Sequence, residues 1–87
     1  MQIGKVIGSL VSTQKDESLV GKKLMVVRII NSDSSETDQE EVAVDTVGAG
    51  IGEYVLLTRG AAARKVFSSS ADAVDSAIIG ILDSIEK

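Results

Sequence analysis

The sequence predicts a mainly β protein: a small OB-like antiparallel β-barrel with one or two short helices near the C-terminus. Short runs of β-branched residues recur along the chain, separated by glycine or polar segments. The 87 residues suffice for one domain, residues 1–87, with one thin core. Hydrophobic residues make up 44% of the chain but aromatic residues only 2%, so small aliphatic side chains must fill the core. Such side chains suit a narrow barrel interior.

Four strands are expected in the first two thirds of the chain. Their β-branched or alternating patterns lie at residues 3–13, 22–30, 41–47 and 53–59. The polar segment 14–20 is expected to be a loop. The acidic segment 31–41 is expected to be a hairpin loop, because it has little apolar surface to bury.

The last third of the chain predicts two short helical segments. Its final element can be either a strand or a helix. Residues 60–65, Gly-Ala-Ala-Ala-Arg-Lys, favour a short helical turn. Residues 68–70 are three serines, which suit a linker and a helix N-cap. Residues 71–77 predict a short helix. Residues 79–85 fit either a final strand or an extension of that helix.

Two residue types are absent, and their absence excludes several kinds of site. The chain has no histidine and no cysteine. This excludes a His-based catalytic triad, a thiolate nucleophile, a zinc site of His and Cys ligands, and His-ligated haem. We therefore expect no catalytic residues, no metal and no cofactor.

The charge of the chain is acidic and unevenly distributed. The net charge of −4 disfavours both nucleic acid and an anionic membrane surface as partners. No signal peptide or apolar span is visible, so a cytoplasmic location is expected. Residues 1–28 carry five basic and two acidic side chains, whereas residues 29–53 carry seven acidic and no basic ones. The segments could form a solvated loop beside a basic strand, or oppositely charged faces that dock on neighbouring copies.

Two expected strands are apolar on both faces. In the second strand Leu24, Val26 and Ile30 alternate with Met25, Val27 and Ile29, and in the fourth Val55 and Leu57 alternate with Tyr54 and Leu56. A lone barrel buries only one face of each strand, and a large exposed apolar patch is unusual in a monomer. The C-terminal helix can cover part of the outer face. We expect another copy of the chain to cover the rest.

A glycine loop, defined as residues 48–52 (Gly-Ala-Gly-Ile-Gly), follows the third expected strand. It does not fit a dinucleotide-binding motif, because Glu53 stands where a glycine is needed and a strand follows instead of a helix. Its glycines predict positive φ or close approach of another backbone. We therefore expect Gly50→Val to hinder assembly, because valine disfavours positive φ and crowds the loop.

Five segments resemble the bacterial microcompartment vertex protein family, the EutN/CcmL family. The fairly specific part is Asp45-Thr46-Val47-Gly48-Ala49-Gly50-Ile51-Gly52-Glu53, within residues 44–56. The other segments are residues 1–8, 21–24, 60–64 and 74–83, in the order of the family. One departure is that Ala61 and Ala62 stand where the family commonly has serine, which argues against a hydroxyl-mediated role there.

The resemblance implies a β-barrel subunit of a cyclic homopentamer that caps the vertices of a polyhedral shell, whose facets are hexameric shell proteins. A ring of this kind uses two different surfaces of each subunit, which fits the two-faced strands. Residues expected at the subunit interface or in an axial loop are Asp45, Gly48, Ala49, Gly50, Ile51, Gly52, Glu53 and Arg64. Arg64 is expected to pair with a carboxylate or a backbone carbonyl.

Two other functions remain open at this point. One is a monomeric OB-like module that binds a small molecule or single-stranded nucleic acid, which the acidic charge and the scarcity of stacking aromatics disfavour. The other is a small enzyme that uses carboxylates such as Asp45 and Glu53, although no residue can be named to support them.

Overall fold

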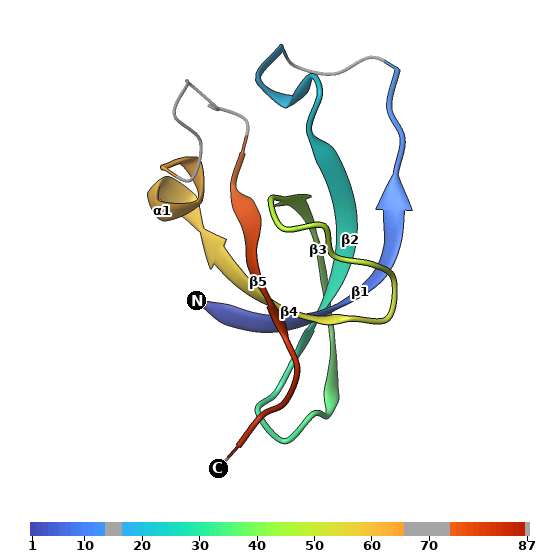
Figure 1. Cartoon of the computed structure of the whole chain (residues 1–87), viewed down its shortest axis with the longest axis vertical. Coiled ribbons are helices and arrows are strands. Elements are labelled where there is room, and N and C mark those ends of the chain that lie inside the picture. The colour runs from blue at the N-terminus through green and yellow to red at the C-terminus, as the bar shows by residue number, and fades with distance from the viewer. Residues whose placement is uncertain (14–16, 66–73, 87) are drawn as a thin grey trace.

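Five β-strands close into a barrel in the order β1-β2-β3-β5-β4 (Figure 1). The computed structural model describes residues 1–13, 17–65 and 74–86. The elements are β1 (Gln2–Leu10), a 3-10 turn (Glu17–Leu19), β2 (Lys23–Ile30), β3 (Glu36–Asp45), β4 (Tyr54–Arg59), α1 (Gly60–Arg64) and β5 (Ser76–Leu82). The predicted fold class is confirmed, and α1 is the one α-helix within the described ranges.

The barrel is antiparallel except at one seam. β1 pairs with β2 and β4, β2 pairs with β3, and β4 pairs with β5, all antiparallel. β3 and β5 pair in parallel, through Val44 with Ala77 and Asp45 with Ile78. The expectation of an antiparallel barrel therefore needs this one correction. Because the parallel pairing is so short, most of β3 and the end of β5 have an edge that the other strand does not cover.

β3 begins five residues earlier than expected, so the predicted loop at 31–41 is wrong beyond Ser35. Residues 36–40 belong to the strand that pairs with β2 although all five are charged or polar. Charged side chains are tolerated here because they are exposed, and Glu40 pairs with Arg28 on the neighbouring strand. The turn itself is closed by Asn31 and Ser35, whose backbone N–H and C=O bond at 2.9 Å.

Asp33 stabilises this turn. Its carboxylate accepts hydrogen bonds from the Ser35 hydroxyl at 2.6 Å and from the Ser35 N–H at 2.9 Å. These bonds favour the ionised form and lower the pKa of Asp33 below its usual value. This stabilisation of the folded state is present at pH values above the pKa that Asp33 has in the unfolded chain. It is lost as the pH falls through the lowered pKa of Asp33 in the folded chain.

The last element is a strand, so the expected helix at 71–77 is wrong at Ser76 and Ala77, which begin β5. Residues 71–73 and the serines at 68–70 lie outside the described residues. Ala77 is fully buried between the partners of β5, and packing overrides the helix propensity of alanine. The Ser76 hydroxyl also donates to Glu41 at 2.9 Å, and Glu41 in turn accepts a bidentate pair of bonds from Arg59.

The interior of the barrel is filled by small aliphatic side chains, as predicted. The buried cluster consists of Val6, Met25, Val27, Ile29, Ala43, Ala49, Val55, Leu57 and Ile78. Gly4 also faces this interior, and a Cβ atom there would overlap Val27 Cγ1 and lie 3.1 Å from Leu57 Cδ1. The absence of a side chain at Gly4 therefore lets β1 approach β2 and β4 closely.

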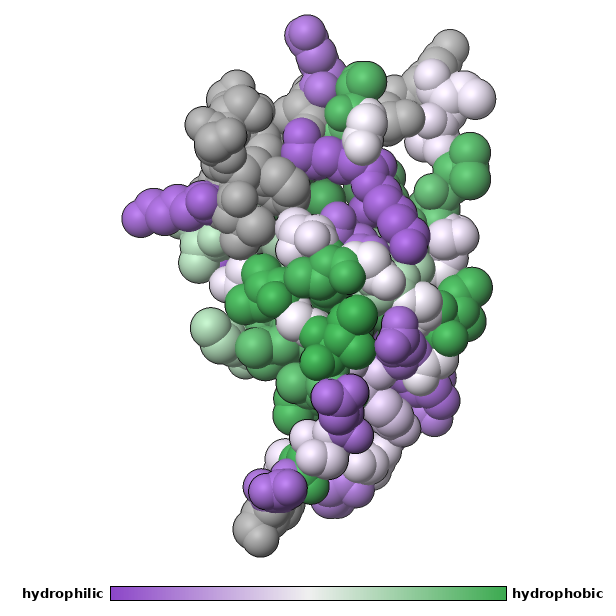
Figure 2. Space-filling model, in the orientation of Figure 1, coloured by the Kyte–Doolittle hydropathy of each residue, from purple (hydrophilic) through white to green (hydrophobic). Residues whose placement is uncertain are grey.

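The outer face of the barrel is only partly covered. A second cluster, on the side of α1, consists of Val44, Ala63, Val74 and Ala77, with Leu19, Leu24 and Ile79 packed against it. On this face Val42 remains exposed, and Val26 and Leu56 are half-buried. Ile81 is also exposed, but it lies opposite the buried Val55 and so on the other face of the sheet. Apolar surface gathers over β4 and β5 in the space-filling view (Figure 2). The expected cover was a C-terminal helix at 71–77, but the part of it that the structure describes is strand, and α1 covers part of the outer face instead. Ile30, expected on an uncovered face, is buried.

Candidate functional site: the glycine loop at the end of β3

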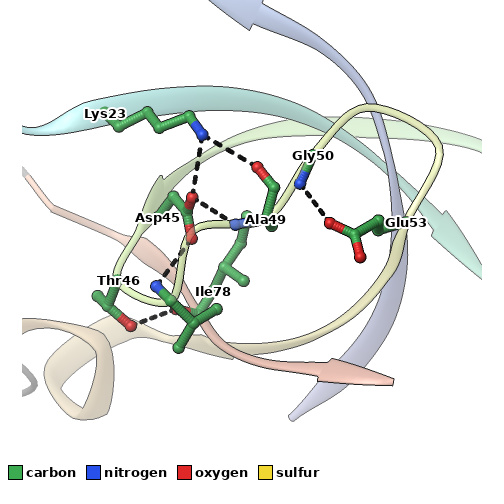
Figure 3. Close-up of polar contacts among 8 residues, drawn as sticks. Lys23, Asp45, Thr46, Ala49, Gly50, Glu53 and Ile78 are labelled. Carbon is green, nitrogen blue, oxygen red and sulfur yellow. Dashed lines mark hydrogen bonds and ion pairs between the residues drawn. The ribbon is translucent and has the colours of Figure 1, made fainter. Parts of the chain in front are cut away.

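Asp45 organises the connection between β3 and β4. Its carboxylate accepts hydrogen bonds from the backbone N–H of Val47 at 3.0 Å and of Ala49 at 2.8 Å. Its side chain is 1% exposed, whereas its ion-pair partner Lys23, at 3.4 Å, is 53% exposed. Lys23 Nζ also donates to the carbonyl of Ala49 at 3.0 Å (Figure 3). The buried Asp45 carboxylate thus binds the loop backbone from its buried side, and Lys23 binds the same loop from the surface.

Ala49 connects the glycine loop to the barrel core. Its side chain is fully buried in the interior cluster with Val6 and Val55. The loop therefore folds inward at this residue. A small side chain is needed because the interior is already filled by the strand residues.

Gly48 and Gly52 have positive φ angles of 79° and 92°. Gly50 does not, so the expectation that it requires positive φ is wrong. Its N–H donates to Glu53 Oε1 at 2.6 Å, and an added Cβ would lie 3.2 Å from the same oxygen. That Gly50→Val crowds the loop stays a prediction. The argument from positive φ applies instead to Gly48 and Gly52.

A matched pair of alanine variants separates backbone strain at positive φ from crowding of the loop. We expect Gly52→Ala to lower the free energy of unfolding by about 1–2 kcal/mol, because an L-residue with left-handed φ is strained. Gly50→Ala should change it by less than about 0.5 kcal/mol, because the flexible Glu53 carboxylate can move away. Urea unfolding at one protein concentration measures both. A larger loss in Gly50→Ala than in Gly52→Ala would contradict this assignment.

Backbone bonds join the loop to β1 and β5. Gly52 N–H donates to the Val6 carbonyl at 2.7 Å, and Val6 N–H donates to the Glu53 carbonyl at 3.0 Å. The Thr46 hydroxyl donates to the Ile78 carbonyl at 2.7 Å. Sequence reasoning missed Thr46 and Lys23. No local signal identifies them, because their partners are distant in sequence.

The expected site residues separate into two groups. Asp45, Gly48 and Ala49 hold the loop, whereas Ile51 (68% exposed) and Glu53 lie on the surface. Arg64 is the last residue of α1, and its expected pairing lies outside the described part of the chain, because the structure does not describe its side chain. The glycine loop therefore presents a small surface on a rigid backbone.

The described residues do not form a catalytic or metal site around this loop. Asp45 and Glu53 each bond to loop backbone, so their carboxylates do not converge on a shared substrate position. Among the residues the structure describes, no three acidic side chains lie close enough to hold a metal ion. In the same part of the chain no helix is long and apolar enough to cross a membrane.

One cavity lies away from the glycine loop, between the 31–35 turn and the C-terminal residues. Its volume is about 180 Å³, and it is lined by Ser34, Tyr54, Leu82, Asp83, Ser84 and Ile85. Pockets for small organic ligands usually measure about 300–1,000 Å³. This cavity is therefore too small to favour a small-molecule binding module.

The family model described as "Ethanolamine utilisation protein EutN/carboxysome" matches residues 1–83. The chain belongs to the EutN/CcmL family. The bacterial microcompartment shell vertex protein PduN of Salmonella typhimurium is 51% identical, with 98% of each chain covered. The carboxysome shell vertex protein CcmL of Gloeobacter violaceus is 47% identical, with 98% of this chain and 85% of the relative covered.

Solved structures of EutN/CcmL family members have the same barrel. The structure of Gloeobacter violaceus CcmL superimposes with a TM-score of 0.93 at 46% identity, covering 100% of this chain and 90% of that one. The pentameric microcompartment shell protein GrpN of Rhodospirillum rubrum superimposes with a TM-score of 0.89 at 44% identity, covering 100% and 98%. The resemblance inferred from the glycine loop and its neighbouring segments is thus confirmed over nearly the whole chain.

Proposed function

We propose that this chain is a structural, non-enzymatic subunit of a bacterial microcompartment shell, and that residues 1–87 form one vertex-type barrel domain. Five copies form a cyclic ring, and the ring caps a vertex of the shell beside hexameric shell proteins. The observation that carries this proposal is the similarity, along nearly the entire chain, to shell vertex proteins, one of them described as pentameric.

The physical role of such a ring is to supply curvature. A flat layer of hexagonal units cannot close, and fivefold units placed in it produce the corners of a polyhedron. A subunit for this purpose needs a rigid fold and surfaces that bind neighbouring subunits. It does not need a catalytic site. The closed barrel and the uncovered apolar side chains Val42 and Ile81 meet both needs.

We also propose a role for the glycine loop at the ring's axis or at the contact between subunits. Ile51 and Glu53 provide the exposed surface of the loop. The three glycines of the loop add no side chains, and Asp45 and Ala49 fix its position. Arg64 belongs to the same proposal as a polar contact of the interface. Small residues suit this place because several copies of one loop must pack closely around an axis.

Native mass spectrometry of the purified chain tests the assembly. We expect a dominant species of five chains, each of 9.1 kDa. A stable monomer, dimer or hexamer as the dominant species would contradict the proposal. Fluorescence anisotropy with labelled single-stranded DNA at low salt tests the alternative function as a binding module. No binding is expected, because the net charge of −4 repels a phosphate backbone.

A further inference from the structure

We propose that the cavity between the 31–35 turn and the C-terminal residues binds one lysine side chain of a hexameric shell protein. The cavity lies towards the end of the molecule where the C-terminus and the turn between β2 and β3 are found, whereas α1 lies towards the other end (Figure 1). The inference rests on the proposed function, because it names a contact between the ring and its neighbours in the shell.

The size of the cavity fits a single extended side chain. Its volume of about 180 Å³ corresponds to about six non-hydrogen atoms, if each takes the ~30 Å³ that a molecule occupies in liquid water. A lysine side chain, with four carbons and one nitrogen beyond Cα, is of this size. Arginine and tryptophan side chains are larger, and so are most small organic ligands.

The lining of the cavity suits a side chain with an apolar stem and a polar end. Its three half-buried residues are Tyr54, Leu82 and Ile85. Its three exposed residues are Ser34, Asp83 and Ser84. Lysine packs its methylene groups along apolar surface and keeps its ammonium group in water. The stem therefore fits the half-buried part, and the ammonium group can donate hydrogen bonds to the carboxylate and hydroxyl groups of the exposed part.

The charge around the cavity favours a cation. Asp83 lines it, and two further carboxylates, Asp33 and Glu86, are each one position away from a lining residue. Among the described residues, the one cation that strand pairing places next to a lining residue is Lys5, opposite Tyr54. Its ammonium group lies 5.9 Å from the centre of the Tyr54 ring, and Lys5 does not line the cavity. Carboxylates therefore outnumber cations here, so an ammonium group is attracted and an anion is repelled.

A lysine of a neighbouring protein fits this cavity better than a free amine does. A contact with so few atoms gives only weak binding by itself. A lysine on a folded surface that already touches the ring enters at a high effective concentration, so a weak contact is sufficient. The cavity contains no residue of the glycine loop, which is the surface proposed for the ring axis or the subunit contact. It is therefore available to a shell protein outside the ring.

Titration with a lysine derivative tests the cavity directly. Nα-acetyl-L-lysine amide is added to the purified chain, labelled at its leucine and isoleucine methyl groups, and the NMR signals of Leu82 and Ile85 are followed. We expect saturable shifts of both signals. The norleucine analogue has the same carbon stem without the ammonium group and should bind at least about fivefold more weakly. Equal binding of the two compounds, or no shift at either residue, would overturn the proposal.

Two asparagine variants test the contribution of Asp83. Asp83→Asn should weaken binding of the lysine derivative about threefold or more, because it removes the charged acceptor from the lining. Asp75→Asn is the matched control, since Asp75 is also exposed and precedes β5, at the opposite end of that strand from Leu82. It should change binding by less than about 1.5-fold, because distant surface charges are screened. Equal weakening in both variants would show that net charge, and not the cavity, attracts the lysine.

A second probe, n-butylamine, distinguishes a free amine from a protein side chain. It has the stem and the ammonium group of lysine but no backbone. We expect the lysine derivative to bind at least as tightly as n-butylamine. If n-butylamine shifts the signals of Leu82 and Ile85 and the lysine derivative does not, the cavity cannot admit a side chain from a protein backbone and the docking proposal is wrong.

Binding to a purified, immobilised hexameric shell protein tests the partner. We expect the native chain to bind, and Asp83→Lys to bind about tenfold or more weakly, because like charges then face each other. Acetylation of the lysines of the hexamer should weaken binding of the native chain in the same way. Native-like binding of Asp83→Lys would contradict the assigned contact.

Native mass spectrometry of Asp83→Lys separates this inference from the proposed function. We expect this variant to remain a pentamer. If the native chain is a pentamer and Asp83→Lys is not, the cavity belongs to a contact between copies, so the hexamer is the wrong partner while the proposed function stands. If the native chain is not a pentamer, the proposed function is wrong and the assignment of the partner fails with it.

Discussion

Gly4→Ala is expected to lower the free energy of unfolding by about 2–3 kcal/mol, because the new methyl group overpacks the barrel interior. Its Cβ would overlap Val27 Cγ1 and lie 3.3 Å from the backbone carbonyl of Arg28, and a backbone atom cannot rotate away. The expected loss is among the largest for any single change in this chain, since the clash occurs where β1 meets two other strands. Urea unfolding, followed by far-UV circular dichroism at one protein concentration, measures it.

Gly8→Ala on the same strand is the matched control for this prediction. A Cβ at Gly8 would have only one neighbour, Val26 Cβ at 4.0 Å, which is an ordinary contact. We expect this change to be neutral or to stabilise by up to about 1 kcal/mol, because alanine restricts the unfolded chain more than glycine does. If Gly8→Ala costs as much as Gly4→Ala, strand propensity rather than close packing explains both results.

The double variant Gly4→Ala with Val27→Ala adds a second test. Removing Cγ1 of Val27 takes away the closest atom, so the two changes should be non-additive. We expect the double variant to lose less stability than the sum of the two single losses. Simple additivity would show that Val27 does not limit the space at Gly4.

Asp45→Ala is the second change for which we expect a large effect, a loss of about 2–4 kcal/mol in the free energy of unfolding. The variant leaves the backbone N–H groups of Val47 and Ala49 without their acceptor, and Ala49 is buried in the core. Because the same loop is proposed to lie at the ring axis or at a subunit contact, the population of pentamers should fall as well. Urea unfolding and native mass spectrometry measure the two effects separately.

Lys23→Ala is the control for Asp45. The two residues form one ion pair, but Lys23 is on the surface and only one loop carbonyl loses a donor. We expect a loss of about 1 kcal/mol, smaller than for Asp45→Ala, because the buried carboxylate keeps its bonds from two backbone N–H groups and only the half-exposed ammonium group is lost. Equal losses in Asp45→Ala and Lys23→Ala would show that the ion pair, and not the carboxylate bonds to the loop backbone, holds the loop.

Much of the barrel could be predicted from local sequence. The strand at 22–30 and the helical turn at 60–65 agree with β2 and α1 to within one residue at each end. Here local propensity and packing favour the same structure, so a short window of sequence is sufficient.

The misplaced elements are those in which strand pairing opposes local preference. At residues 36–40, pairing with β2 makes a strand of a segment whose charges predict a loop. At Ala77, burial between β3 and β4 makes a strand of a segment whose alanines predict a helix. The partner of residues 36–40 is the neighbouring strand β2, but the charges of the segment hide the apolar alternation of a strand. The partners of Ala77 lie far away in the chain, so no local pattern signals them.

The sequence by itself determined the fold class, the family and the excess of apolar strand faces, because composition, alternation and the glycine-loop motif are local properties. Only the tertiary structure decided which glycines have positive φ, that Lys23 and Asp45 meet, and which apolar side chains stay uncovered. The reason is physical. Register, strand bulges and barrel closure bring together residues far apart in the chain, and those contacts set burial and charge pairing.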